Sequence, residues 1–184
     1  MQLQFCGGAR TVTGSQHLLS VNGSKVLLEC GLYQGHRAEA QAKNQHFAYD
    51  PATLDAVLLS HAHIDHSGNL PSLVARGYHG RIYATSATVA LYQLMLRDSA
   101  YLQERDIEWV NKIRRRRGEP LAEPLYSIED TEEALRSLAS GGARCRPALG
   151  EWLAGGLAAM QRDDERRNAV SHPAGRFTFT GLRA

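Results

Sequence analysis

Three histidines and one aspartate lie within the six-residue segment His61-Ala-His-Ile-Asp-His66. If the segment is extended, His61 and His63 project to the same side, because alternate residues of a strand share a face. Neutral imidazoles are common ligands of zinc, manganese and iron, and two of them can share one ion. Asp65 and His66 are adjacent and point in different directions, so this pair would reach a second ion more readily than the ion bound by His61 and His63. The cluster therefore predicts a metal site, and two such ions about 3.5–4 Å apart would activate water for hydrolysis.

A solvated polar loop is the alternative interpretation of the same residues. Three features favour the metal site: the ligand types, their spacing, and their position after an apolar segment. That segment, Asp55–Ser60, has the continuous apolar pattern of a short strand buried on both faces. Loops that follow buried strands often present functional side chains, so the position of the motif after this strand favours a metal site.

The elements around the cluster alternate between strands and helices. The dipeptide Asn22-Gly23 predicts a tight hairpin turn near the start of the chain, because both residues tolerate a positive φ. We expect strands around residues 3–5, 16–21, 25–29, 55–60 and 81–84, and helices at 37–45, 70–76, from about 87 to 105 or beyond, and at 128–138. This order predicts an α/β fold that begins with antiparallel strands.

A glycine-rich segment, Gly7–Ser15, connects the first two expected strands. Glycines allow the backbone to approach another group closely. The segment lacks the Gly-Lys-Ser/Thr ending of a phosphate-binding loop, so it does not predict a nucleotide site. His17 follows directly, and we favour a histidine on a strand face over one that lines a cleft.

Length and composition fit one globular domain. The chain has 184 residues, of which 43% are hydrophobic and 22% charged, with a net charge of +2. It contains no run of about 18 apolar residues, so we expect no membrane-spanning helix. The N-terminus lacks the basic start and long apolar stretch of a signal peptide. Three cysteines without C-x-x-C spacing argue against a disulfide scaffold and indicate a reducing, cytoplasmic location.

Several motifs together resemble one known family. The segment Ser60-His-Ala-His-Ile-Asp-His-Ser-Gly68 resembles the H-x-H-x-D-H signature of the metallo-β-lactamase superfamily. The flanking segments resemble its β-CASP branch, which holds RNA-processing nucleases such as ribonuclease J and the cleavage subunit of the messenger-RNA 3′-end machinery. These segments are Gly7–Ser15, Leu27–Gly35, Arg81–Thr85, Asp98-Ser99 and residues 119–126. The resemblance covers roughly residues 1–138.

The resemblance implies an α/β metallo-β-lactamase-like fold, here the N-terminal part of a four-layer αββα sandwich. It implies that His61 and His63 bind one metal ion and that Asp65 and His66 bind a second, with zinc as the metal and manganese as the alternative. Asp65 is also implied as the catalytic residue that orients the nucleophile. Glu29 stands where the family usually has an aspartate. It would support the segment His61–His66, which we call the metal loop. The implied reaction is hydrolysis of RNA phosphodiesters by a hydroxide that bridges the two ions.

The resemblance ends near residue 140. The later histidines and the bridging aspartate that complete the family's site have no match here, and the surroundings of His172 differ from the family's pattern. We therefore divide the chain into a partial metallo-β-lactamase domain at residues 1–139 and a Gly/Ala/Arg-rich tail at 140–184. The tail is expected to be truncated or frameshifted and poorly ordered, because it has little hydrophobic patterning.

Two other functions stay open. One alternative to RNA hydrolysis is that the chain is another hydrolase of the superfamily, such as a thioesterase or lactonase. The other is that it is a catalytically incomplete remnant that binds only metal or a partner. The small number of ligands predicts little ribonuclease activity from this chain alone. RNA is the partner that the resemblance implies, no membrane is expected, and a homo-oligomer is left open. For Arg114–Arg117, a solvated helix end is favoured over contact with RNA phosphates.

Overall fold

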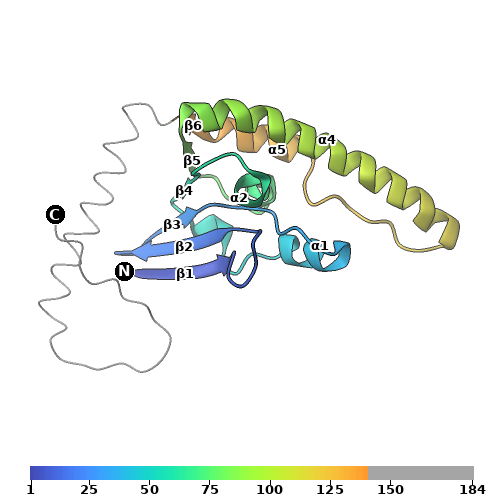
Figure 1. Ribbon diagram of the computed structural model, residues 1–184, viewed down its shortest axis with the longest axis horizontal. Helices are drawn as coiled ribbons and strands as arrows, with labels where there is room; N and C mark the ends of the chain where they lie inside the picture. Colours follow the sequence, from blue (N-terminus) through green and yellow to red (C-terminus); the bar gives the residue numbers. More distant parts are fainter. Residues whose placement is uncertain (141–184) are drawn as a thin grey trace, which may run out of the picture.

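The computed structural model describes residues 1–140 of the chain. Within these residues six strands form one sheet, and their order in the sheet is also their order in the sequence (Figure 1). The first three strands are antiparallel, whereas β3 and every later strand pair in parallel. The strands are β1 (Gln2–Gly7), β2 (Gln16–Val21), β3 (Ser24–Leu28), β4 (Ala56–Leu58), β5 (Arg81–Ala84) and β6 (Leu138–Ser140). The carboxyl ends of β3 to β6 therefore share one edge of the sheet.

The turn between β2 and β3 confirms the prediction from Asn22-Gly23. Asn22 has a φ of 52° and Gly23 a φ of 86°. Two successive residues with positive φ match the right-handed twist of the two strands that they join. The hairpin thereby fixes the register of β2 on β3, from Val21 opposite Ser24 to His17 opposite Leu28.

Five α-helices and one short 3₁₀ helix connect and follow the strands within residues 1–140. They are α1 (Arg37–Gln45), the 3₁₀ helix at Pro51–Thr53, α2 (Ile64–Ser67), α3 (Leu70–Ala75), α4 (Ser86–Arg117) and α5 (Ile128–Arg136). The Thr85 hydroxyl accepts a hydrogen bond from the Thr88 amide at the start of α4, and Gly118 ends the helix with a φ of 67°. The capping box expected at Ser127 is present at the start of α5.

The hydrophobic core lies between the sheet and the helices. One row across the sheet consists of Leu18, Leu27, Val57 and Ile82, each at most 6% exposed. This row packs against apolar side chains of α3, α4 and α5, among them Leu70, Leu73, Tyr92, Leu96 and Leu135. Burial of this row holds the strand ends, and the loops that follow them, in fixed positions.

The structure confirms the expected α/β class and differs from the sequence-based elements in two places. The segment after Ser60 contains the short helix α2, where we expected only a loop. Residues 138–140 form β6, where the pattern predicted the end of a helix. Helix α4 runs beyond residue 105, as expected, and ends at Arg117, so the four arginines form its last turn. None of the helices within residues 1–140 is long and apolar enough to cross a membrane. The expected tail, apart from residue 140, lies outside the described residues.

Candidate metal centre

The predicted ligands lie at the edge where the parallel strands end. Glu29 follows β3 directly, and His61 follows β4 after two residues. Asp65 and His66 lie in α2, the first helix after β4. Segments about thirty residues apart in the sequence meet at this edge because β3 and β4 are hydrogen-bonded neighbours.

Backbone hydrogen bonds hold the α2 segment against the segment that follows β3. The Cys30 amide donates to the His66 carbonyl at 2.7 Å, and the Leu32 amide donates to the Ile64 carbonyl at 3.0 Å. Between them, a Cβ on Gly31 would lie 1.7 Å from the Asp65 carbonyl oxygen. Only glycine fits at this position, since the contact is with backbone atoms that cannot rotate away. The position of the metal loop therefore depends on residue 31.

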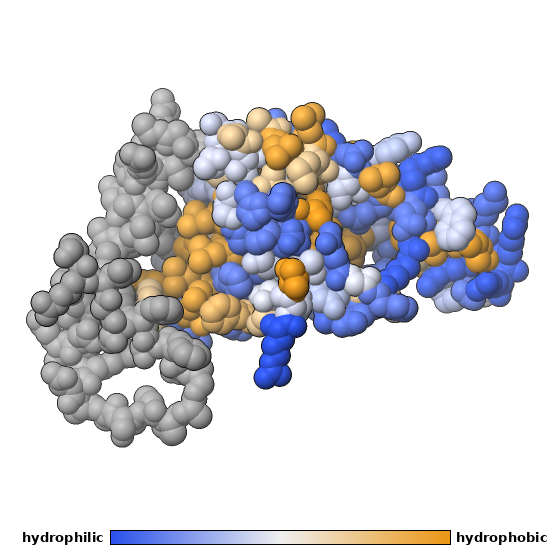
Figure 2. Space-filling model, viewed as in Figure 1, coloured by the Kyte–Doolittle hydropathy of each residue, from blue (hydrophilic) through white to orange (hydrophobic). Residues whose placement is uncertain are grey.

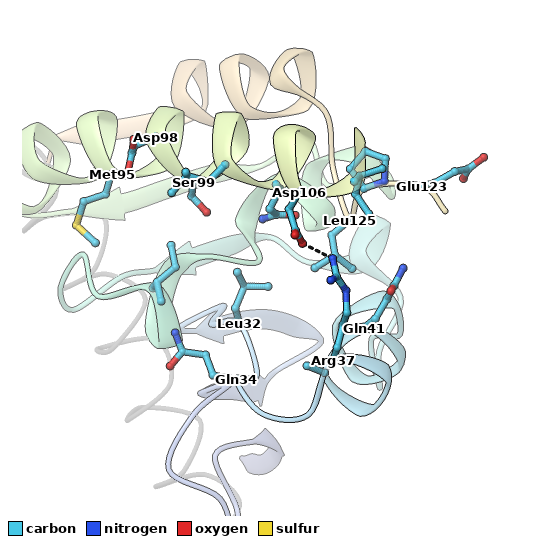
Figure 3. Close-up of a pocket in the computed structure, with 16 residues that line it drawn as sticks. Leu32, Gln34, Arg37, Gln41, Met95, Asp98, Ser99, Asp106, Glu123 and Leu125 are labelled. Carbon is cyan, nitrogen blue, oxygen red and sulfur yellow. Dashed lines mark hydrogen bonds and ion pairs between the residues drawn. The ribbon is translucent and has the colours of Figure 1, made fainter. Parts of the chain in front are cut away.

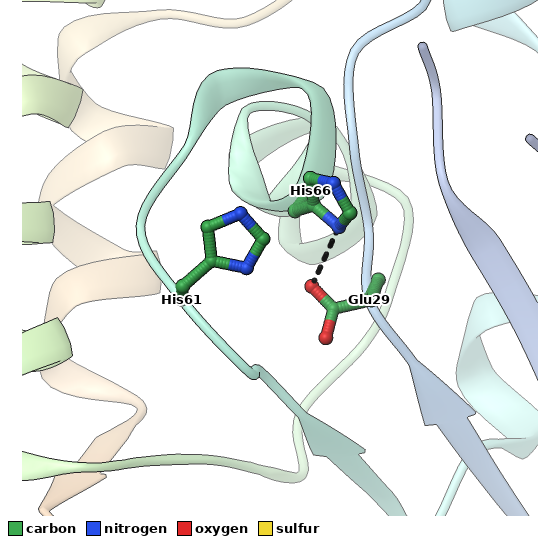
Figure 4. A group of neighbouring side chains, drawn as sticks. All are labelled: Glu29, His61 and His66. Atoms are coloured by element: carbon green, nitrogen blue, oxygen red, sulfur yellow. Dashed lines mark ion pairs between the residues drawn. The ribbon is translucent and has the colours of Figure 1, made fainter. Parts of the chain in front are cut away.

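Three side chains that could bind a metal ion converge at this edge. Single ligand atoms of Glu29, His61 and His66 all lie within 4.8 Å of one another (Figure 4). Oε2 of Glu29 lies 3.4 Å from Nδ1 of His66, and the two imidazole rings have centroids 4.2 Å apart. This spacing is short enough for a single ion to contact ligands from two different strand ends.

Glu29 is buried and held in an unusual backbone conformation. It is 9% exposed and has a φ of 64°, a region that residues other than glycine seldom occupy. Its Oε1 accepts a hydrogen bond from the Ser60 amide at 2.8 Å, which ties the end of β3 to the start of the metal loop. The local strain is held by this contact and by the Glu29 amide, which donates to the Leu58 carbonyl at 2.9 Å.

The buried polar atoms of the cluster fit either a shared proton or a bound cation. Oε2 of Glu29 and Nδ1 of His66 are buried and have no hydrogen-bond partner among the described residues. Buried polar atoms without partners cost free energy unless a proton is shared between them or an ion is bound. One carboxylate and two imidazoles also form a common donor set for zinc and other first-row divalent ions.

The other two predicted ligands lie beside the cluster. The His63 ring lies 4.7 Å from the His61 ring, measured between centroids, at the N-terminal cap of α2. Oδ2 of Asp65 lies 3.6 Å from Nε2 of His66, on the other side of that ring from Glu29. The division into a His61–His63 pair and an Asp65–His66 pair stays a prediction. His172 lies outside the described residues.

His17 is a neighbour of the cluster on β2. Its Nε2 lies 3.2 Å from the Ser15 hydroxyl, and its Nδ1 is buried without a partner among the described residues. Burial lowers the pKa of His17, and the nearby negative charge of Glu29 partly opposes that effect. His17 is on the strand, as expected, and its electrostatic interaction with Glu29 and His66 places it near the candidate site.

A cavity of about 650 Å³ opens next to the metal loop, between α1 and α4. Leu32 (Figure 3) and Ile64, which share one of the hydrogen bonds described above, form part of its lining. An ion pair between Arg37 of α1 and Asp106 of α4 joins its walls. No local sequence pattern predicts this cavity, because its lining comes from segments that are far apart in the sequence and meet only in the folded chain.

Comparison with known proteins gives a family match over most of the chain. Residues 10–141 match the family model described as the metallo-beta-lactamase superfamily. Ribonuclease TTHA0252 of Thermus thermophilus is 42% identical over 155 residues, which are 83% of this chain and 30% of the relative.

Two further relatives match over shorter stretches. Transcription termination factor FttA of Cenarchaeum symbiosum is 39% identical over 101 residues, 54% of this chain and 16% of the relative. Endoribonuclease YSH1 of Kluyveromyces lactis is 33% identical over 93 residues, 50% of this chain and 12% of the relative. These matches confirm the resemblance to the β-CASP branch, and the chain spans less than a third of the length of each relative.

Proposed function

Because the chain belongs to the metallo-β-lactamase superfamily, we propose that it contributes to a metal-dependent hydrolysis of RNA phosphodiester bonds. The observation that carries the proposal is the convergence of two predicted ligands, His61 and His66, with the buried carboxylate of Glu29 at the end of two parallel strands. The ribonuclease names of two relatives support RNA as the substrate class. Cysteine usage supports a cytoplasmic location.

We assign the ligands as the motif predicts, with His61 and His63 for one ion and Asp65 and His66 for a second. The orientation of His66 supports the second pair: its Nδ1 faces Glu29 at 3.4 Å and its Nε2 faces Asp65 at 3.6 Å. A metal-binding imidazole commonly donates its other N–H to a carboxylate, which fixes the tautomer and the ring orientation. Glu29 then acts as the positioning residue that leaves Nε2 of His66 free for the ion.

A divalent ion bound here would supply Lewis-acid stabilisation of the negative charge that develops on phosphoryl oxygens. Zinc fits the imidazole and carboxylate donors, and manganese accepts the same ligands. Asp65 would orient the attacking water, because its carboxylate lies beside the imidazole of His66, which would share the ion. Glu29, through Ser60, keeps the start of the loop fixed while the substrate binds.

Metal content is the most direct test. Purified full-length chain should bind zinc or manganese, and a His61→Ala, His63→Ala double variant should lose most of that metal. A His36→Ala, His79→Ala double variant is the matched control, because neither histidine is in the cluster. Equal metal content in all three proteins would exclude the loop as the metal site.

Activity is tested on single-stranded RNA with added zinc or manganese, with Asp65→Ala as the control for contaminating nuclease. We expect slow cleavage that Asp65→Ala abolishes, since a reacting group displaced by about 1 Å can lower a rate about a hundredfold. Hydrolysis of thioesters or lactones instead of RNA would favour a different hydrolase. Metal binding without hydrolysis of any of these substrates would favour the incomplete remnant.

A further inference from the structure

The distal half of α4 extends away from the sheet and carries a basic surface. In Figure 1 this part of α4 projects beyond the rest of the described residues. Between Arg105 and Arg117 the helix has six cations and two acids, a net charge of +4. Asn111 exchanges two hydrogen bonds with the backbone of Ala122, at 2.8 and 2.9 Å, so the returning chain supports the helix from one side. Another face of this half of the helix is open to solvent.

The open side has aromatic and basic residues in alternation. Five residues follow one another along this side at intervals of three or four: Tyr101, Arg105, Trp109, Lys112 and Arg116. At 3.6 residues per turn they share one face about 80° wide, which we call the α4 stripe. Tyr101 is 55% exposed and Trp109 is 61% exposed, so both rings face solvent. Figure 2 shows the distal part of the molecule as mainly hydrophilic, with isolated apolar side chains.

We propose that the α4 stripe binds single-stranded RNA, with unpaired bases stacked on Tyr101 and Trp109 and phosphates held by Arg105, Lys112 and Arg116. This inference rests on the proposed function, because it adds an RNA-binding surface remote from the metal loop. Exposed aromatic rings interleaved with cations are the combination by which proteins bind single strands without sequence preference. The positive charge supplies the attraction to phosphates.

The dimensions of the stripe fit a strand with separated bases. Eight residues separate the two rings, about 12 Å along the helix axis. This distance is more than three times the spacing of about 3.4 Å between stacked bases, so the two rings take bases that are not adjacent. Arg105 lies midway, where the connecting phosphates pass.

The acids near the stripe leave its positive charge in place. Glu108 pairs with Arg105 at 3.2 Å, but both side chains are more than 60% exposed, so this pair is screened and readily exchanged for a phosphate. Asp106 pairs with Arg37 on the cavity side of α4. Asp98 lies one turn before Tyr101 and limits the stripe at its proximal end.

The test measures RNA binding in the absence of metal, so that it is independent of hydrolysis. A labelled uridine 12-mer is titrated with full-length chain in EDTA, and anisotropy gives the affinity at several salt concentrations. In a Trp152→Phe background Trp109 is the only tryptophan, and its fluorescence should be quenched as RNA binds. Trp109→Leu, which keeps an apolar side chain, should weaken binding at least about fivefold. Tyr101→Leu should have a similar effect, and circular dichroism should show both variants folded.

Two charge-matched variants separate the stripe from general electrostatic attraction. Lys112→Gln, Arg116→Gln should reduce the slope of log affinity against log salt by about 1.4, because each phosphate that a cation neutralises on a single strand contributes about 0.7 to that slope. Arg115→Gln, Arg117→Gln removes the same charge from the same end of the helix but outside the stripe, and should leave most of that slope unchanged. Equal effects of the two double variants would overturn the proposal.

Two further results would also overturn the proposal. One is equal affinity for double-stranded RNA, whose paired bases cannot stack on the rings. The other is a dimer in light scattering that Trp109→Leu dissociates while RNA affinity stays unchanged, since the stripe would then be a protein interface. RNA binding through the stripe without cleavage would instead leave the inference intact and count against the proposed hydrolysis.

Discussion

Replacing Gly31 with alanine should destabilise the protein and displace the metal loop. The added Cβ would lie 1.7 Å from the carbonyl oxygen of Asp65, 2.2 Å from its carbonyl carbon and 2.8 Å from the amide nitrogen of His66. Because all three are backbone atoms, the segment after β3 and the α2 segment must separate. The two hydrogen bonds beside the contact, from the amides of Cys30 and Leu32, would then lengthen or break.

The size of the effect follows from these contacts. Two broken backbone hydrogen bonds cost about 1 kcal/mol each, and overpacking adds about 1–3 kcal/mol. We therefore expect Gly31→Ala to lower the free energy of unfolding by about 3–5 kcal/mol. At about 2–4 °C per kcal/mol for a chain of this length, Tm falls by about 6–20 °C. Zinc affinity should fall as well, because Asp65 and His66 move with the backbone.

Gly23→Ala is the matched control for this measurement. Gly23 has a φ of 86° and no atom within 4 Å of the added Cβ, so it tests backbone strain without a clash. Its cost should be about 1–2 kcal/mol, with unchanged zinc affinity. Thermal unfolding followed by circular dichroism and zinc titration against a chelator measure both quantities. If Gly31→Ala behaves like Gly23→Ala in both assays, close backbone contact does not position the metal loop.

Three other measurements test separate parts of the structure. Glu29→Gln keeps an oxygen for the Ser60 amide but loses the carboxylate charge that faces His66, so zinc affinity should fall about 10–100-fold in a chelator competition; unchanged affinity would exclude a positioning role. Ser127→Ala removes the cap of α5 and should lower the free energy of unfolding in urea by about 1 kcal/mol, and a neutral result would contradict that cap. Burial raises the pKa of the Cys30 thiol, which stays protonated and should react with a thiol reagent in a Cys6→Ser, Cys145→Ser background only after unfolding. Rapid reaction of the folded protein at neutral pH would show that Cys30 is accessible.

Local patterns in the sequence determined the elements that depend on neighbouring residues. Asn22-Gly23 specified the hairpin, and the Ser127–Asp130 capping box specified the start of α5, because these interactions form within a few residues. The metal motif was visible for the same reason, since four ligand side chains lie within six residues. The stretch at residues 138–140 was missed because a three-residue strand has no periodicity of its own and forms only by pairing with β5.

Tertiary structure decided how the separate segments act together. Glu29 reaches His66 and the Ser60 amide because β3 and β4 are parallel neighbours, a pairing that no local pattern specifies. Gly31 is required by the carbonyl of Asp65, which lies more than thirty residues away in the sequence. The α4 stripe is open because only the proximal half of that helix, at Tyr92, Leu96 and Ala100, is buried against the core. Periodicity shows which residues share a helix face, but only packing determines which face meets the core and which meets solvent.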